Sequence, residues 1–218
     1  MIKNAHFSID DVGASLKYIF NKNPSSIFDL RLYSQLLKWH EQYKLVSTLY
    51  CIVNIEGFCI SELPDKYVNE FADNADWLKF GFHAGDEHPF LQDLNYRESY
   101  YTAKEIIEKK KMGCTNSLRL HSWYASDEQE SFLNSMGVTT IFMPPDCKEM
   151  YIDGEYKKNG ITHRKTDIWF EKMMIDQMPL DVNRSFLTLF THEWCFDEQK
   201  DKIDAVLSIL KQNDYIFV

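Results

Sequence analysis

The sequence predicts an α/β fold, a distorted or incomplete (β/α) barrel of about seven parallel strands, in a single domain over residues 1–218. Strand-like apolar segments alternate with segments of helical periodicity, and such alternation predicts parallel strands joined by helical crossovers. The 218 residues provide about six to seven such units, because a complete eight-unit barrel usually needs about 250 residues. An open doubly wound sheet is the alternative architecture.

Seven segments have the composition of strands, and several are rich in β-branched residues. They are expected at residues 5–9, 46–53, 78–83, 117–123, 138–143, 185–192 and 215–218. A β-hairpin insertion is expected near residues 145–175, because Asp153-Gly154 and Asn159-Gly160 are two-residue turn signals. This insertion is open to two interpretations, a cover over the functional pocket or a homodimer contact.

Helical spacing of apolar residues marks the segments between these strands. Helices are expected at residues 30–43, 64–75, 96–112, 126–136 and 197–212. Capping-box pairs support two of the helix starts, because a polar residue is followed three positions later by Glu or Gln. These pairs are Asn95 with Glu98 and Ser126 with Gln129.

The net charge of −9 and the five cysteines limit the partners and the compartment. Nucleic acid and anionic membranes require a positive surface, so neither is expected as a partner, and a neutral or cationic substrate is favoured. The cysteines form no C-x-x-C pair and are interpreted as reduced packing residues. The N-terminus does not resemble a signal peptide and no run of about 18 apolar residues occurs, so a cytoplasmic location is expected.

Titratable residues stand at the ends of four expected strands. These residues are Asp10 and Asp11; His83, with Glu87 and His88 just after it; Arg119 and His121; and His192. Each alone has an ordinary interpretation, such as a turn, a buried imidazole or a structural ion pair. Because parallel strands open their carboxyl ends onto one face, we expect these side chains to meet in one pocket.

One carboxylate with two imidazoles is a common metal-ligand set that suits Zn²⁺ or Fe²⁺ and leaves positions open for water and substrate. Neighbouring residues in a strand point to opposite sides, but this rule loosens at a strand end. Asp10 and Asp11 can therefore both reach the pocket, one as a metal ligand and the other as a base.

Five short motifs resemble those of the polysaccharide deacetylases (carbohydrate esterase family four). The first is "FSIDDVG" at Asp10 and Asp11; the others are His83 with its following loop, "RLHSW" from Arg119, "TDIW" and "LFTH". The resemblance implies a divalent metal, with zinc as the first choice, bound by Asp11, His83 and His88. Glu87 and Asp86 are the alternatives for the third ligand.

The same resemblance implies roles for the remaining residues. Asp10 would be the general base, His192 the catalytic acid, and Arg119 the group that orients the base. Saccharide contacts are expected from Trp123, His121, Trp169 and Asp167. The implied reaction is the metal-dependent removal of N- or O-acetyl groups from a saccharide.

Three positions depart from the family pattern. Val12 replaces a glycine, His83 and His88 are five rather than four residues apart, and His121 stands near Arg119 where a proline is usual. Two alternatives therefore stay open: a saccharide-binding module without turnover on the same scaffold, and a metal-independent glycosidase that uses a carboxylate pair.

Overall fold

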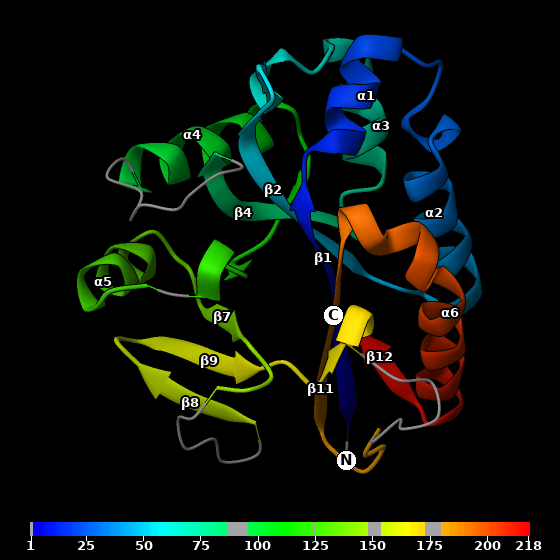
Figure 1. Cartoon of the computed structure of the whole chain (residues 1–218), viewed down its shortest axis with the longest axis vertical. Helices are drawn as coiled ribbons and strands as arrows, with labels where there is room; N and C mark the ends of the chain where they lie inside the picture. The colour runs from blue at the N-terminus through cyan, green and yellow to red at the C-terminus, as the bar shows by residue number, and fades with distance from the viewer. Residues whose placement is uncertain (1, 87–95, 124, 148–153, 173–179) are drawn as a thin grey trace.

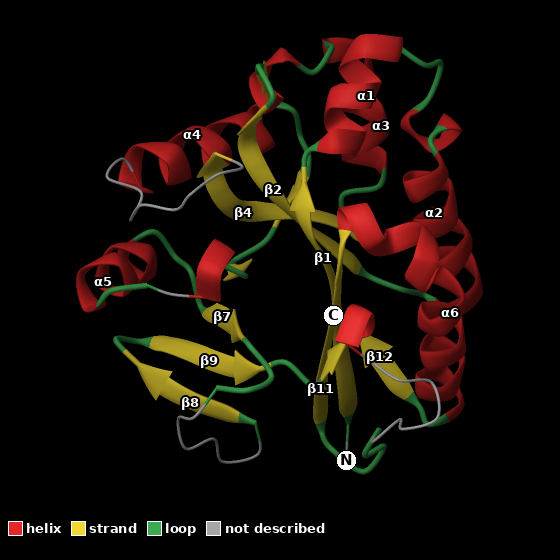
Figure 2. Ribbon diagram, viewed as in Figure 1, coloured by secondary structure: helices red, strands yellow, loops and turns green. Residues whose placement is uncertain are grey.

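The larger of two sheets is built on β1 (Lys3–Val12), whose residues 5–10 are all buried. A strand buried on both faces is typical of a parallel sheet that is covered by helices. This arrangement is seen in a computed structural model, which describes residues 2–86, 96–123, 125–147, 154–172 and 180–218 (Figures 1 and 2).

The two sheets consist mainly of parallel strands. In the larger sheet the order is β10 (Ile168–Trp169), β11 (Phe186–His192), β1, β2 (Ser47–Ile55), β4 (Leu78–Asp86) and β5 (Gly113–Cys114). In addition, β12 (Tyr215–Phe217) pairs with β1, and β3 (Phe58–Cys59) pairs with β2. The smaller sheet has the order β6 (Ser117–Leu118), β7 (Thr140–Met143), β9 (Ile161–Lys165) and β8 (Glu155–Lys158). Of the described pairs, β2–β3 and β8–β9 are antiparallel and the others are parallel.

The strand order is that of an interrupted barrel rather than of a doubly wound sheet. From β1 it continues through β2, β4 and β5, then through β6, β7 and β9 of the second sheet, and β10 and β11 lead back to β1. A doubly wound sheet would instead reverse its order at a switch point. Within the described part of the chain, no ladder joins β5 to β6 or β9 to β10. The expected α/β fold with mainly parallel strands is confirmed.

Six α-helices flank the sheets in the described part of the chain. They are α1 (Ala14–Lys22), α2 (Arg31–Tyr43), α3 (Val68–Asp73), α4 (Tyr96–Lys109), α5 (Asp127–Ser135) and α6 (Phe196–Gln212). Figure 1 shows α2 and α6 side by side, where the indole N–H of Trp39 donates to Asp204 at 2.8 Å. Residues 32, 33, 36, 39 and 43 form the buried face of α2 at the helical spacing expected from the sequence.

The expected hairpin is present as β8 and β9. Asn159 and Gly160 both have positive φ, 49° and 80°, as a two-residue type I′ turn requires. The capping box of Ser126 and Gln129 is also present at the start of α5. Asn95 and Asp153, which carry the other two signals, lie outside the described residues.

Two expected elements differ from the structure, and one helix was not expected. The strand expected at 117–123 is only β6, because a 3₁₀ turn over His121–Trp123 ends it. The helix expected at 64–75 is a 3₁₀ turn followed by the short α3. No element was expected at α1, because its N-cap residue, Gly13, provides no side-chain cap. Its first N–H groups are capped instead by Glu193, from the other end of the chain.

None of the described helices combines the length and the apolar composition that a bilayer-spanning segment needs.

Candidate functional site

The two neighbouring aspartates lie at a β-bulge in β1. The register between β1 and β2 shifts between Ile9 and Val12, so Asp10 and Asp11 together face one residue of β2. Asp11 has a φ of 57°, in the left-handed region that residues other than glycine rarely adopt. A bulge re-aims side chains, and this one lets both carboxylates reach the same side of the sheet.

Asp10 is almost fully buried and is paired with Arg119. Its Oδ2 lies 3.2 Å from Arg119 Nε, and its Oδ1 accepts a hydrogen bond from Ser8 at 3.4 Å. Burial raises the pKa of Asp10 above its usual value, although the charge of Arg119 acts in the opposite direction. The carboxylate is therefore a stronger base than an exposed aspartate.

Arg119 is completely buried in an aromatic environment. Its guanidinium lies 4.2 Å from the ring centre of Phe190 and 4.9 Å from that of Trp123. Its Nη1 donates to Thr166 Oγ1 at 2.7 Å. These contacts fix the guanidinium, so it can hold the Asp10 carboxylate in one orientation.

His83 lies at a second bulge, in β4. The register between β2 and β4 passes from Phe82 to Ala84 without a partner for His83. His83 Nδ1 is hydrogen-bonded to the carbonyl oxygen of Arg119, which can only accept, so Nδ1 carries the proton. The Nε2 atom lies 3.1 Å from Asp11 Oδ1.

A neutral His83 would therefore direct a lone pair at a carboxylate oxygen. Two acceptors at 3.1 Å repel one another unless a proton or a cation lies between them. No hydrogen-bond donor among the described residues reaches the buried Asp11 Oδ1. A backbone carbonyl on Nδ1 is also the usual partner that fixes a metal-binding histidine for coordination through Nε2.

His121 completes a three-residue group that fits a cation. One ligand atom each from Asp11, His83 and His121 lies within 4.8 Å of the other two. Burial lowers the pKa of His121, with a further contribution from His83, and this favours the neutral form that binds metals. For Asp11, burial acts to raise the pKa, but the interactions of its carboxylate with the surrounding histidines outweigh it and bring the pKa to about 2.

His192 lies beside Asp10, and Glu171 orients it. The two strand ends are in register, with Asp10 opposite His192. Glu171 Oε1 accepts from the backbone N–H of His192 at 2.6 Å and lies 3.1 Å from His192 Nδ1. Burial lowers the pKa of His192, but the hydrogen bond to Glu171 and the charges of Asp10 and Asp11 raise it above its usual value. His192 is thus arranged to hold a proton.

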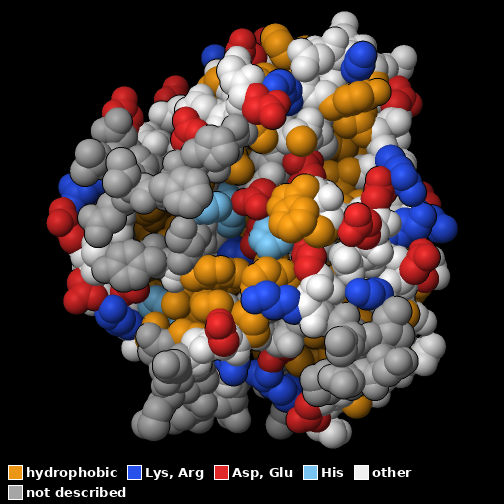
Figure 3. Space-filling view, viewed as in Figure 1, with side chains coloured by type: hydrophobic (Ala, Val, Ile, Leu, Met, Phe, Trp, Pro, Cys, Tyr) orange, Lys and Arg blue, Asp and Glu red, His pale blue; other side chains and the backbone are white. Residues whose placement is uncertain are grey.

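Aromatic side chains border this group of residues. The ring of Trp194 stacks on His192 with centroids 5.2 Å apart, and its indole N–H donates to Asp11 Oδ2 at 3.3 Å. Trp169 lies edge-on to His192 at 5.7 Å and next to Trp123 at 6.3 Å. Trp194 is 71 % exposed, so a ligand can reach it. Figure 3 shows histidine and acidic side chains together near the middle of this face.

Most of the site residues expected from the sequence come together, and one described residue does not. Asp10, Asp11, His83, Arg119, His121, Trp123, Trp169 and His192 form one connected set. Asp167 is paired instead with Arg184 and with Thr188. Thr188 lies on β11, four residues before His192. His88 and Glu87 lie outside the described residues, and the exposed Asp86 is not part of the three-residue group.

Glu171 was not expected from the sequence. Its carboxylate follows Trp169 by two positions in "TDIWFEKM", and a 3₁₀ turn over Phe170–Lys172 brings it back to His192. The sequence signal that could have revealed it is a carboxylate just after β10, the strand that pairs with β11, which ends in His192. Nothing in the local periodicity distinguishes it from Asp167.

No protein-family model and no curated protein matches the sequence. Solved structures do match over nearly the whole chain. A peptidoglycan N-acetylglucosamine deacetylase matches with a TM-score of 0.56 and 13 % identity, over 99 % of this chain and 85 % of that one. A protein from Mycobacterium smegmatis described as a polysaccharide deacetylase matches with a TM-score of 0.59 and 11 % identity, over 98 % and 86 %.

The chain has the fold of the polysaccharide deacetylases. The same fold also occurs within a 4-α-glucanotransferase from Thermococcus litoralis, with a TM-score of 0.62 and 11 % identity. That match covers 100 % of this chain but only 39 % of the glucanotransferase. Because one fold carries two different chemistries on saccharides, the fold does not choose between them. The reaction has to be inferred from the side chains at the strand ends.

Proposed function

We propose that the protein is a metal-dependent hydrolase that removes N- or O-acetyl groups from a saccharide. The observation that carries the proposal is the group of Asp11, His83 and His121, flanked by the Asp10–Arg119 pair and the Glu171–His192 pair. A ligand set with a base and an acid on either side is what metal-assisted hydrolysis requires. The likeness to solved deacetylases is consistent with it.

Among the described residues, Asp11, His83 and His121 would hold the cation. One carboxylate and two imidazoles fit zinc. A divalent cation held there would polarise the substrate carbonyl and lower the pKa of water to about 7. The Arg119 carbonyl keeps the proton of His83 on Nδ1, so that Nε2 is available as a ligand. His88, implied by the resemblance as the third ligand, stays a prediction.

Asp10 is the proposed general base. Its burial and its raised pKa make its carboxylate a better proton acceptor, and Arg119 keeps it in place. Proton transfer from water to Asp10 would generate the nucleophile that attacks the acetyl carbonyl.

His192 is the proposed general acid. With Nδ1 held by Glu171, the imidazolium can give the proton on Nε2 to the departing amine or alcohol. The nearby Asp10 and Asp11 favour this charged form before the reaction. The proposed acid, His192, and the proposed base, Asp10, are therefore neighbours across β1 and β11.

The aromatic residues and the acidic charge favour a saccharide that is not acidic. Trp194 is exposed beside His192, and Trp123 and Trp169 are half-buried next to it. Amphipathic rings of this kind suit the apolar face of a sugar. With a net charge of −9, the chain would repel polyanionic chains.

The test is release of acetate from N-acetylated oligosaccharides by protein loaded with zinc. We expect release that stops on addition of a chelator and returns with zinc. Asp10→Asn should lower kcat by roughly 10²–10⁴-fold while zinc binding is retained. Bound oligosaccharide without acetate release would instead indicate a binding module. Cleavage of glycosidic bonds in the presence of chelator would favour the carboxylate-pair alternative.

A further inference from the structure

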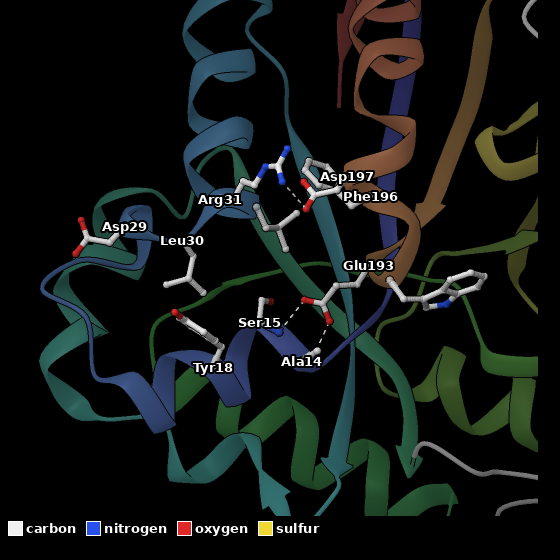
Figure 4. A pocket seen from close by; sticks show the side chains of 11 residues that line it. Ala14, Ser15, Tyr18, Asp29, Leu30, Arg31, Glu193, Phe196 and Asp197 are labelled. Carbon is white, nitrogen blue, oxygen red and sulfur yellow. Dashed lines mark hydrogen bonds and ion pairs between the residues drawn. The ribbon is translucent and has the colours of Figure 1, made fainter.

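Besides the strand-end site, the structure has a groove and a cavity whose polar groups are used differently. The groove in Figure 4 lies between the first turns of α1, α2 and α6. There Glu193 accepts from the backbone N–H groups of Ala14 and Ser15, and Arg31 pairs with Asp197 at 3.0 Å. The protein itself uses these charged groups, whereas the cavity contains a buried hydroxyl to which no described residue is hydrogen-bonded.

The cavity lies toward the amino ends of the strands whose carboxyl ends carry the proposed active site. It has a volume of about 390 Å³, and its lining includes Thr48 of β2, Lys79 of β4 and Thr140 of β7. Each of these is the first or second residue of its strand. His83 follows Lys79 by four positions on β4, which is about 13 Å along a strand. Ligand sites commonly have volumes of about 300–1,000 Å³, so the cavity is large enough for a small molecule.

The hydroxyl of Thr48 is the group that indicates a ligand. Thr48 lines the cavity and is 2 % exposed, and none of the described residues forms a hydrogen bond with its side chain. Buried hydroxyls nearly always have a hydrogen-bond partner, because an unpaired one has lost its water without compensation. A polar ligand in the cavity would supply that partner.

Further hydroxyls of the lining form a connected chain. Ser117 Oγ lies 2.8 Å from Thr115 Oγ1 and 2.9 Å from the hydroxyl oxygen of the buried Tyr50. Thr115 and Ser117 both line the cavity. Because a hydroxyl both donates and accepts, such a chain can reverse its protons and donate to an acceptor in the cavity.

The lining is cationic although the chain as a whole is acidic. The net charge is −9, yet the described residues contribute Lys79 and Arg164 and no carboxylate side chain to the lining. Lys79 Nζ donates to the carbonyl oxygen of Ala75 and has no carboxylate partner among the described residues. Arg164 Nη2 pairs with Glu155 at 2.6 Å, which occupies one nitrogen of the guanidinium. His6 also lines the cavity but stays neutral, because burial and nearby arginine charges lower its pKa to about 3.

A phosphate group fits this set of donors. Ammonium, guanidinium and hydroxyl groups are the usual partners of phosphate oxygens. Val46, Phe142 and Phe186 add apolar surface to the lining. Since a water molecule takes about 30 Å³, the cavity of about 390 Å³ has room for more than a phosphate ion. The ligand is therefore expected to have an organic part.

We propose that this cavity binds the phosphate group of a small phosphate ester. The phosphate group binds at Thr48 and Lys79, which are register partners on β2 and β4, and the organic part packs on Phe142 and Phe186. The cavity takes no residue from the proposed active site, so this binding does not depend on the proposed function.

The experiment titrates the full chain, with zinc present, with glucose 6-phosphate, inorganic phosphate and glucose, and follows calorimetry and the backbone amide signals in NMR spectra. For glucose 6-phosphate we expect a Kd below about 1 mM and shifts at Thr48, Thr115 and Thr140. Inorganic phosphate should shift the same signals at higher concentration, because it lacks the organic part. Glucose, which lacks the phosphate group, should leave these signals unchanged.

Variants of the lining test the two main contacts. Lys79→Gln should raise the Kd for glucose 6-phosphate by about 10- to 100-fold, because a hydrogen bond from a charged donor is lost. Thr48→Val has nearly the same shape and should raise it by about 2- to 10-fold. Lys66→Gln is the matched control, because it removes the same charge from an exposed lysine that also donates to backbone carbonyls and does not line the cavity. It should leave the Kd near the wild-type value.

Several results would overturn the phosphate site. These are an absence of shifts at the lining amides of the wild type, shifts confined to Asp11, His83 and His192, or glucose binding as tightly as its phosphate ester. An equal rise of the Kd in Lys66→Gln and Lys79→Gln would also overturn it, because the effect would then come from net charge alone. If Thr48→Val does not fold, the half-buried Lys79→Gln still decides. Acetate release is measured separately, so failure of the phosphate site leaves the proposed function standing.

Discussion

Two glutamate–histidine pairs in this protein have the same spacing and different environments. Glu171 Oε1 lies 3.1 Å from His192 Nδ1 at the strand ends, and Glu130 Oε1 lies 3.1 Å from His163 Nε2 between α5 and the β8–β9 hairpin. The His192 and Glu171 side chains are 16 % and 12 % exposed, whereas those of His163 and Glu130 are 1 % and 6 % exposed.

The surroundings shift the pKa values of the two imidazoles in opposite directions. Burial lowers the pKa of His163, and the charge of Lys158 adds to this even though Glu130 acts against it. Asp10, Asp11 and Glu171 together raise the pKa of His192 despite its burial. His163 is also stacked on Tyr156, with the ring centres 4.5 Å apart. The same pair of residue types therefore contacts a hairpin in one place and favours a protonated imidazole in the other.

The largest expected difference is in kcat, between variants of His192 and of His163. His192→Gln removes the proposed acid and should lower kcat by roughly 10²–10⁴-fold. His163→Gln should leave kcat near the wild-type value and lower the free energy of unfolding by about 1–3 kcal/mol, because Glu130 loses a buried partner. Acetate release and denaturant unfolding of both variants measure the two effects. Equal losses of kcat would remove the distinction.

The next effect concerns stability. Glu130→Ala leaves His163 without its carboxylate and also removes an acceptor for Asn159 at the hairpin turn. We expect the free energy of unfolding to fall by about 1–3 kcal/mol, because the buried imidazole and the Asn159 amide lose their acceptor. Urea unfolding, with Glu128→Ala of the same helix as the exposed control, measures it. A loss no larger than in that control would show that the pair does not anchor the hairpin.

The smallest effect is a shift in pH dependence. Glu171→Gln keeps an acceptor for His192 Nδ1 but removes the negative charge, so the pKa of His192 should fall. The imidazolium acid is present below that pKa, and the alkaline limb of kcat should therefore move to lower pH by about one unit. Glu130→Gln should leave this limb in place. An alkaline limb that stays put or moves upward in Glu171→Gln would mean that His192 is not the acid.

Residue type and strand position were enough to predict that most of these side chains lie close together. Asp10, His83, Arg119 and His192 each follow an apolar segment, and parallel strands bring such ends together regardless of the intervening chain. That reasoning gave the α/β fold and the connected set of side chains. It assigned His121 a saccharide contact, which stays a prediction, and it did not foresee that a ring nitrogen of His121 lies within 4.8 Å of ligand atoms of Asp11 and His83.

The parts that were missed depend on contacts between distant segments or on backbone irregularities. The cap of α1 comes from Glu193, about 180 positions away, so local capping rules could not find that helix. Glu171 reaches His192 only because a 3₁₀ turn follows β10. The bulges at Asp11 and His83 change which way side chains point. The alternation of side chains used to predict their direction assumes a regular strand without a bulge.

Anomalous scattering at the zinc edge from crystals of the zinc-loaded protein tests the central claim most directly. The account predicts one strong peak that contacts Asp11, His83 and His121, at ligand distances of about 2.0–2.2 Å. A peak bound by other residues, or an empty space between these three at full zinc loading, would contradict it.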